Sequence, residues 1–512
     1  RAGVLNTRTF VTGATVVALW GWLGFAFGAD PLGGGGPIGS ALTGDCISPA
    51  DRVFARQLIE DYERRFGARS VAVGLVTPPQ LTFFPLAGWL WRDLFVFNYV
   101  DLDATTGFQD WDCTDWSYDG HNGSDTDIRS FGEQIIGVPV YAAQDGVVIA
   151  THDGEEDMNT VWAGQPANFV IIDHGSGREG WYFHLKKNSV AVAVNDTVFA
   201  GHQVGLCASS GVSTGPHLHF ELRDSGVPYE PFVGPCHTGD SGWETQPVLD
   251  RSAYLHDFGV THEDINAAGP WPWEWPRTGQ IAQTDPVLRV WWYGTALPAS
   301  SRWKVQFKRP NGTIIDRANQ NFNNPFWRWY NWWWTYNLPA DMQTITGTWH
   351  LILRINDVSI IEAPIEVVAV RDPNFNRPPE PVSVQFDPLD PHPGDVLSCR
   401  VSTSLTLDDL DYDIVRYEYV WTVNGQEVRH VTTAAHSDVL PRNFVTNTAQ
   451  IRCSVTPGDG KNVGPTATRS LIVGLFGVPA VSAWGLAIFA LLLMTAGTLL
   501  AGWRRRSDVT IR

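Results

Sequence analysis

The pattern of apolar and polar residues predicts a chain built mostly from short β-strands. Runs that alternate between apolar and polar residues, bounded by glycine and proline, occupy most of the chain after residue 136. One helix is predicted, over residues 48–66. Ser48 suits its N-cap, Pro49 suits its first turn, and apolar residues recur at helical spacing. We expect this amphipathic helix to pack on the domain that follows it.

Both ends of the chain carry apolar stretches. Arg1 and Arg8 precede the apolar residues 10–29, the layout of an export signal or of an uncleaved membrane anchor in residues 1–30. Residues 31–44 are rich in glycine and predict a flexible spacer, which with the helix fills residues 31–79. Trp484–Trp503 carries no charge, is long enough to cross a bilayer, and is followed by three arginines. A C-terminal transmembrane helix is therefore predicted.

The middle of the chain predicts two β-sandwiches. After a connector at residues 238–277, short β runs fill residues 278–371. A proline-rich linker, 372–381, leads to a second β-module at 382–475. In that module Cys399, Trp421 and Cys453 follow the order of an immunoglobulin-type sandwich, in which a buried Trp packs on a disulfide between the sheets.

The first sandwich contains an unusual aromatic run, Phe326–Trp334. So many neighbouring aromatic side chains cannot all face one core if the segment is extended. Packing between domains is the preferred explanation, and a glycan-binding or partner-binding face is the alternative.

Composition narrows the class of protein. Acidic residues outnumber basic ones 54 to 36, and the net charge of −18 argues against nucleic acid as a partner. The 24 Trp, 49 Gly and 33 Pro fit β-structure with many turns. Six cysteines in an exported chain predict disulfides. Besides Cys399–Cys453, the pairs suggested by position are Cys207–Cys236 and Cys46–Cys113, although connectivity does not follow from sequence.

Candidate chemistry gathers around His217 and His219. The turn Ser213–Pro216 leads into a predicted strand at residues 217–222, on which the two histidines project from one face. Two neighbouring imidazoles suit a metal ligand beside a proton-transfer group. Upstream, His121 and Asp125 stand four residues apart. Together these residues offer two imidazoles and a carboxylate, the three-ligand set of a zinc site that keeps one position open for water.

Several motifs in the same order resemble the LytM/lysostaphin-type zinc endopeptidases of bacterial cell walls. They are His121-x-x-x-Asp125, Gly137-Val-Pro-Val-Tyr-Ala-Ala143, Tyr182-Phe-His-Leu185 and Ser213-Thr-Gly-Pro-His-Leu-His-Phe-Glu-Leu222. The resemblance implies a mainly antiparallel β peptidase domain at residues 80–237. The whole chain is then mainly β: this domain, two β-sandwiches and a C-terminal transmembrane helix.

The resemblance also implies roles for single residues. His121, Asp125 and His219 match the family's zinc ligands, and His184 and His217 match the two catalytic histidines that stay off the metal. Asp127 is a competing ligand, but its spacing from His121 favours Asp125. The acidic loop Asp153–Asp157 is expected to be a solvated turn rather than a calcium site.

The expected function is that of an exported zinc metalloendopeptidase that cuts peptidoglycan peptides in the cell envelope. Residues 478–512 resemble the C-terminal sorting tails of Gram-negative surface proteins, so removal by a sorting protease and permanent anchoring both stay open. Two other classes compete: a non-catalytic scaffold or activator with this fold, and an adhesin that binds glycans through its sandwich modules.

Overall fold

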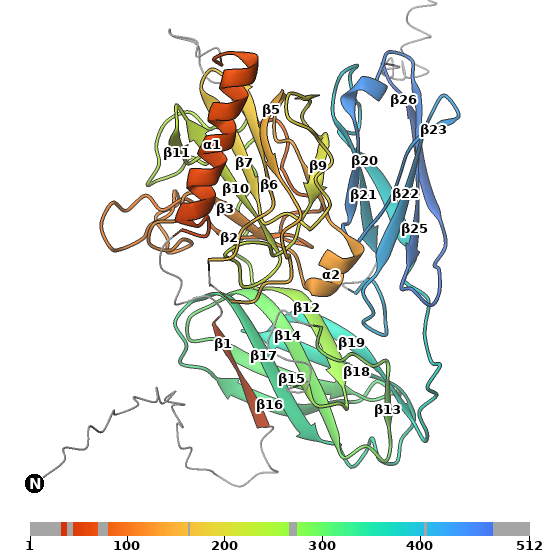
Figure 1. The fold of residues 1–512 in the computed structure, drawn as a ribbon. Helices are drawn as coiled ribbons and strands as arrows, with labels where there is room; N and C mark the ends of the chain where they lie inside the picture. Colours follow the sequence, from red (N-terminus) through yellow and green to blue (C-terminus); the bar gives the residue numbers. More distant parts are fainter. Residues whose placement is uncertain are drawn as a thin grey trace, which may run out of the picture.

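The computed structural model describes residues 32–37, 45–69, 80–161, 164–265, 274–403 and 407–474. Within these ranges the chain is mainly β, as predicted, and its strands gather into three units (Figure 1). We call them the first unit (strands β2 to β11), the second unit (β1 and β12 to β19) and the third unit (β20 to β26).

The first unit is an antiparallel sheet with strand order β2-β3-β10-β7-β6-β5-β8, in which β11 also pairs with β10. Strands β4 and β9 form a separate antiparallel pair. The central strand β10 is buried along almost its whole length. The elements are β2 (Phe95–Asn98), β3 (Ser124–Asp127), α2 (Phe131–Ile136), β4 (Pro139–Tyr141), β5 (Gly146–His152), β6 (Phe169–Gly175), β7 (Arg178–Phe183), β8 (Thr197–Val198), β9 (Gln203–Leu206), β10 (His217–Asp224) and β11 (Val227–Tyr229).

Helix α1 (Pro49–Phe66) lies across this sheet and confirms the predicted helix (Figure 1). The Ser48 hydroxyl accepts a hydrogen bond from the Asp51 backbone N–H at 3.0 Å, as an N-cap should. Ala55 and Ile59 of the helix are buried against apolar side chains of β5, β6 and β7. The helix is therefore held to the sheet by burial of its apolar face.

The second unit packs two sheets around one core. Their strand orders are β1-β17-β14-β12 and β13-β19-β18-β15-β16. The core is rich in aromatic rings from both sheets, among them Trp292, Trp303 and Trp349. The elements are β12 (Tyr254–Thr261), β13 (Gln280–Ala282), β14 (Val287–Leu297), β15 (Arg302–Lys308), β16 (Ile314–Asn321), β17 (Trp327–Asn337), β18 (Gly347–Ile355) and β19 (Val358–Val368).

The aromatic run of β17 is used in packing. Trp334 is buried in the core of the second unit, whereas the Trp329 ring packs at a tilt against Phe97 of the first unit, with ring centroids 4.9 Å apart. The two sides of this strand thus serve two different cores, which is how an extended segment accommodates so many aromatic side chains.

Part of the glycine-rich stretch is a strand rather than the predicted spacer. Residues Leu32–Pro37 form β1, which pairs with β17 as the edge strand of the second unit. A Cβ at Gly34 would stand 2.9 Å from the Trp333 ring, and one at Gly35 would stand 2.3 Å from the Asn331 carbonyl oxygen. Glycine is required because the backbone approaches the tryptophan-rich strand too closely for any side chain.

The third unit consists of the sheets β20-β21-β24 and β23-β22-β25-β26. Cys399 and Cys453 form the predicted disulfide, and the buried Trp421 is paired with Cys453 across neighbouring strands. The immunoglobulin-type assignment stays a prediction. The elements are β20 (Val382–Asp387), β21 (Leu397–Thr403), β22 (Arg416–Val423), β23 (Gln426–Thr433), β24 (Ser437–Leu440), the 3-10 helix η2 (Arg442–Phe444), β25 (Gln450–Gly458) and β26 (Ala467–Ile472).

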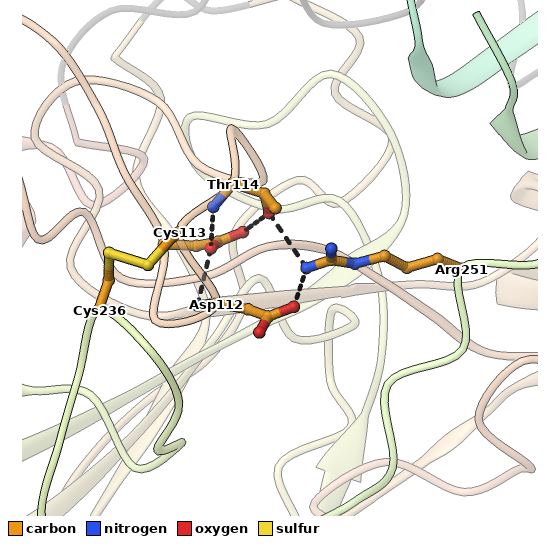
Figure 2. Close-up of a disulfide and its surroundings, with 6 residues drawn as sticks. Asp112, Cys113, Thr114, Cys236 and Arg251 are labelled. Atoms are coloured by element: carbon orange, nitrogen blue, oxygen red, sulfur yellow. Dashed lines mark hydrogen bonds and ion pairs between the residues drawn. A yellow bond between two sulfur atoms is a disulfide. The ribbon is translucent and has the colours of Figure 1, made fainter.

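The other two predicted disulfides are wrong. Cys113 pairs with Cys236, which ties the loop between β2 and β3 to the loop after β11 (Figure 2). Beside this bridge, Arg251 forms an ion pair with Asp112. The remaining cysteines, Cys46 and Cys207, are buried and not disulfide-bonded. Sequence separation misled the prediction, because the partners come together only through the folded loops.

The third unit is joined to the first by buried polar contacts. Tyr141 of the first unit donates to Asp438 of the third at 2.9 Å. His436, in the third unit, has its Nδ1 3.0 Å from Asp93 of the first unit and its Nε2 2.8 Å from Asp408. The two carboxylates outweigh the effect of burial and raise the pKa of His436 to about 9.

The membrane segments expected at residues 10–29 and 484–503 lie outside the described residues. Within the residues that the structure describes, no helix is both long enough and apolar enough to cross a bilayer.

The ion pairs of His436 with Asp93 and Asp408 predict that the stability of the fold depends on pH. Since the folded pKa of about 9 exceeds the unfolded value of 6.5, this group's stabilisation is complete below pH 6.5 and is lost as pH rises to 9. We expect wild type to lose about 3 kcal/mol relative to His436→Gln between pH 6 and 9.5, measured by urea unfolding. If the unfolding free energies of the two proteins changed with pH in parallel, the raised pKa of His436 would be contradicted.

Candidate metal centre

The pairing of β10 with β3 places the site's side chains opposite one another. In the antiparallel register His219 faces Asp125, and His217 faces Asp127. His217 and His219 share one face of β10, as the alternation predicted. Both are buried, with 6% and 0% of their surface exposed.

His121 enters the site from the turn that precedes β3. Its Nδ1 donates to the Tyr99 carbonyl oxygen at 2.7 Å, which directs Nε2 toward the other residues of the cluster. That Nε2 lies 3.2 Å from His219 Nδ1 and 3.1 Å from Asp125 Oδ2. A Cβ at Gly123 would come within 2.7 Å of the His219 ring, so glycine is needed in the turn between His121 and Asp125.

Asp125, and not Asp127, is the carboxylate that joins the two histidines. Its Oδ1 lies 2.9 Å from His219 Nδ1, and its Oδ2 accepts a hydrogen bond from the Asn98 amide at 2.9 Å. Asp127 instead accepts from the Tyr293 hydroxyl at 2.6 Å, a contact with the second unit. Asp125 is therefore the carboxylate of β3 that lies within the cluster, and its role as a metal ligand stays a prediction.

His219 is oriented by a buried acid that the sequence analysis did not single out. Its Nε2 lies 3.5 Å from Glu221 Oε2. Glu221 has no exposed surface and is paired with Arg52 at 2.8 Å and with Arg223. The period of two along β10 places Glu221 on the face of His219, so the sequence did contain a signal for it. A carboxylate behind a ligating imidazole fixes the ring's orientation and raises its basicity.

A fourth potential ligand comes from an unexpected place. The Cys46 sulfur, just before helix α1, lies 2.9 Å from His219 Nδ1. One ligand atom from each of Cys46, His121, Asp125 and His219 lies within 4.8 Å of the other three, and all four residues are buried. Nothing in the local sequence around Cys46 marks it as part of this site.

His184 and His217 stand beside the cluster. His184 Nδ1 bonds the Ser210 carbonyl oxygen at 2.6 Å, and His217 Nδ1 bonds the Gly215 carbonyl oxygen at 2.8 Å. Their ring centroids are 4.5 Å apart, and the His184 centroid lies 6.0 Å from that of His219. Because each Nδ1 is engaged by the backbone, each Nε2 is available to exchange a proton.

The charges in the site shift one another's pKa. Burial raises the pKa of Asp125, but His121 and His217 outweigh this effect and hold it well below the ordinary value. Burial lowers the pKa of His121, yet the neighbouring Asp125 raises it to about 10. Burial and then the charge of His217 lower the pKa of His184. Asp125 is thus ionised, and His184 is the histidine of this group best suited to stay neutral.

The donor set fits zinc. Two imidazole nitrogens and a carboxylate oxygen, each oriented by a further contact, match the ligands and supporting contacts of zinc sites in proteins. In the acidic loop, by contrast, Asp153 and Asp157 accept backbone N–H groups of residues 187–190, and Glu156 pairs with Lys187. Among the described residues, the metal-binding geometry is found at the histidine cluster.

Other histidines serve the fold. His174 Nδ1 bonds the Asp145 carbonyl oxygen at 2.9 Å and lies in the first unit, away from the cluster residues.

Comparison with known proteins identifies the segment around the site. The model of peptidase family M23 matches residues 120–231. The peptidoglycan DD-endopeptidase ShyA of Vibrio cholerae is 39% identical over 108 residues, which are 21% of each chain. The DD-carboxypeptidase/endopeptidase Mpg of Neisseria meningitidis is 40% identical over 95 residues, 19% of each chain.

Two matches of lower sequence identity cover a larger share of this chain. Lysostaphin of Staphylococcus staphylolyticus is 27% identical over 160 residues, 30% of each chain. A solved zinc-containing peptidase from Vibrio cholerae is 27% identical, with a TM-score of 0.19 over 29% of this chain and 41% of that one. The chain spans about one fifth of the length of the two more similar relatives. The chain therefore carries, in the unit that holds the histidine cluster, a LytM-type domain of peptidase family M23.

Proposed function

We propose that this chain is an exported zinc metalloendopeptidase that hydrolyses peptide bonds of peptidoglycan in a bacterial cell envelope. The observation that carries the proposal is the convergence of His121, Asp125 and His219, with His184 and His217 beside them. These side chains come from distant parts of the chain, and each is held by a specific contact.

The three ligands would be His121 through Nε2, Asp125 through its carboxylate and His219 through Nδ1. When bound, zinc supplies a Lewis acid that polarises the scissile carbonyl and lowers the pKa of a water molecule to about 7. Glu221 and the Tyr99 carbonyl orient the two imidazoles, and Asn98 orients the carboxylate.

The two remaining histidines would move protons. A neutral His184, with its Nδ1 engaged by Ser210, accepts a proton at Nε2 as the nucleophile forms. His184 then returns this proton to the leaving amine. His217, whose Nε2 lies 3.7 Å from Asp125, stabilises the negative charge that develops on the substrate. The low exposure of both rings keeps these transfers away from bulk water.

The substrate and location rest on similarity and sequence. Two relatives are named as endopeptidases, one of them of peptidoglycan, which supports a peptidoglycan peptide as substrate. The excess of acidic residues argues against nucleic acid. The terminal apolar segments support export, attachment to the membrane and possible action of a sorting protease on the tail.

A glycan-binding adhesin is less well supported. That hypothesis came from the aromatic side chains, and the structure uses several of them in packing. Trp303 and Trp334 lie in the core of the second unit, and Trp329 contacts Phe97 of the first unit. A non-catalytic scaffold is also less well supported, because a protein without catalytic function has no need for this complete set of ligands and proton-transfer groups.

Removal of single side chains should separate metal binding from turnover. We expect His219→Ala or Asp125→Ala to lose both zinc and activity, because each removes a ligand. His217→Ala should keep one zinc per chain while its turnover falls about 10²- to 10⁴-fold. Zinc content is measured on the purified protein, and activity as peptides released from purified sacculi and identified by mass spectrometry.

The matched control is His430→Ala, which removes an exposed imidazole from the third unit. It should retain wild-type zinc content and activity. Full activity of His219→Ala, or of a preparation from which zinc has been stripped, would contradict the proposed function.

The contact between Asn98 and Asp125 gives a finer test. Asn98→Ala removes the amide that orients the carboxylate, so we expect zinc affinity to fall about 10- to 100-fold. Arg328, which also bonds Asn98, keeps its bonds to the Phe97 and Ser117 carbonyl oxygens. Competition with a zinc chelator measures the affinity. An unchanged zinc affinity would show that Asn98 does not orient Asp125 for metal binding. Asn323→Ala, at an exposed position, serves as the control.

A further inference from the structure

We propose that the Cys46 thiolate is the fourth ligand of this zinc site and holds the peptidase in a latent state. The inference rests on the proposed function, whose catalysis needs a ligand position open to water. A catalytic zinc has three protein ligands and one such position, whereas a site with four protein ligands is closed. Cys46 converts the first kind of site into the second.

The position of the sulfur supports this assignment. It lies 2.9 Å from His219 Nδ1 and belongs to the group of four ligand atoms that lie within 4.8 Å of one another. Cys46 is 1% exposed and not disulfide-bonded. The sulfur therefore stands beside the three other ligand atoms, where it can take the coordination position that a catalytic zinc leaves to water.

The simpler explanation is a cysteine buried as a small apolar side chain. Cys207 is an example, because it is buried and belongs to no ligand cluster among the described residues. Cys46 also belongs to the apolar cluster beneath α1, but it differs from Cys207 because its sulfur lies among two imidazoles and a carboxylate. Thiolate is a preferred ligand of zinc, and this set of one sulfur, two nitrogens and one oxygen suits a tetrahedral site.

Cys46 belongs to a segment that is separate from the sheet that provides the other ligands. Residues 45–69 are attached by the apolar face of α1 and by ion pairs of Arg52 with Glu221 and of Arg69 with Glu179. Asp45, next to Cys46, pairs with Arg52 and accepts a hydrogen bond from Asn122 at 3.1 Å. These contacts hold the Cys46 sulfur in the site.

The same contacts couple the segment to the site. Glu221 bonds Arg52 of α1 on one side and lies 3.5 Å from His219 on the other. Withdrawal of residues 45–69 would remove the sulfur and the partner of Glu221 together. In this step the metal–sulfur contact is replaced by a water molecule, and the released thiolate takes up a proton from solvent. The peptidase is then active only when the segment has left.

Cobalt substitution tests the ligand directly. Co²⁺ in place of zinc gives an intense near-ultraviolet charge-transfer band only if a thiolate is bound to it. We expect this band in the full chain loaded with Co²⁺, its loss in Cys46→Ala, and its retention in Cys207→Ala, which removes the other free cysteine. Cobalt bound without the band in the wild-type chain would overturn the inference, and that observation needs no variant to fold.

Activity tests the latency. Cys46→Ala keeps the three other ligands, so we expect it to retain one zinc per chain and to cleave sacculi about tenfold faster or more than wild type. Cys207→Ala should stay at the wild-type rate. If the band is present but Cys46→Ala is no faster than wild type, latency is overturned. If no variant cleaves sacculi although the band is present, the proposed function fails while the ligand assignment stands.

Discussion

The antiparallel pairing of β10 with β3 is the constraint on which the site depends. It places His219 opposite Asp125, and the turn before β3 adds His121 at a distance of 3.1 Å from the same carboxylate. A shift of one residue in this register would turn His219 to the other face of the sheet. Nearly every residue of β10 is buried, which makes such a shift costly, so the strand that forms the core also fixes the positions of the candidate ligands.

The surrounding units reinforce this geometry. Arg328 of the second unit bonds two carbonyl oxygens and the side chain of Asn98, which in turn holds Asp125. The Tyr293 hydroxyl of the same unit donates a hydrogen bond to Asp127. This contact holds the second carboxylate of β3 away from the cluster. The second unit is therefore part of the support of the site, although none of the four cluster residues found in the described part of the chain comes from it.

Some of this architecture could be predicted from the sequence and some could not. Local rules identified helix α1, the Cys399–Cys453 disulfide and the face shared by His217 and His219, because period, capping and motif order depend on nearby residues. The pairing of Cys113 with Cys236 depends on where two loops meet, which spacing does not encode. The strand β1 was missed because glycine carries no apolar pattern. Cys46 was assigned to a disulfide because its true neighbours are more than seventy residues away.

The most direct test of the account is X-ray diffraction at the zinc absorption edge from crystals of the zinc-loaded protein. The account predicts one strong anomalous peak about 2.0 to 2.2 Å from His121 Nε2, His219 Nδ1 and an Asp125 carboxylate oxygen. A peak located elsewhere in the chain, with these three side chains unoccupied by metal, would contradict it.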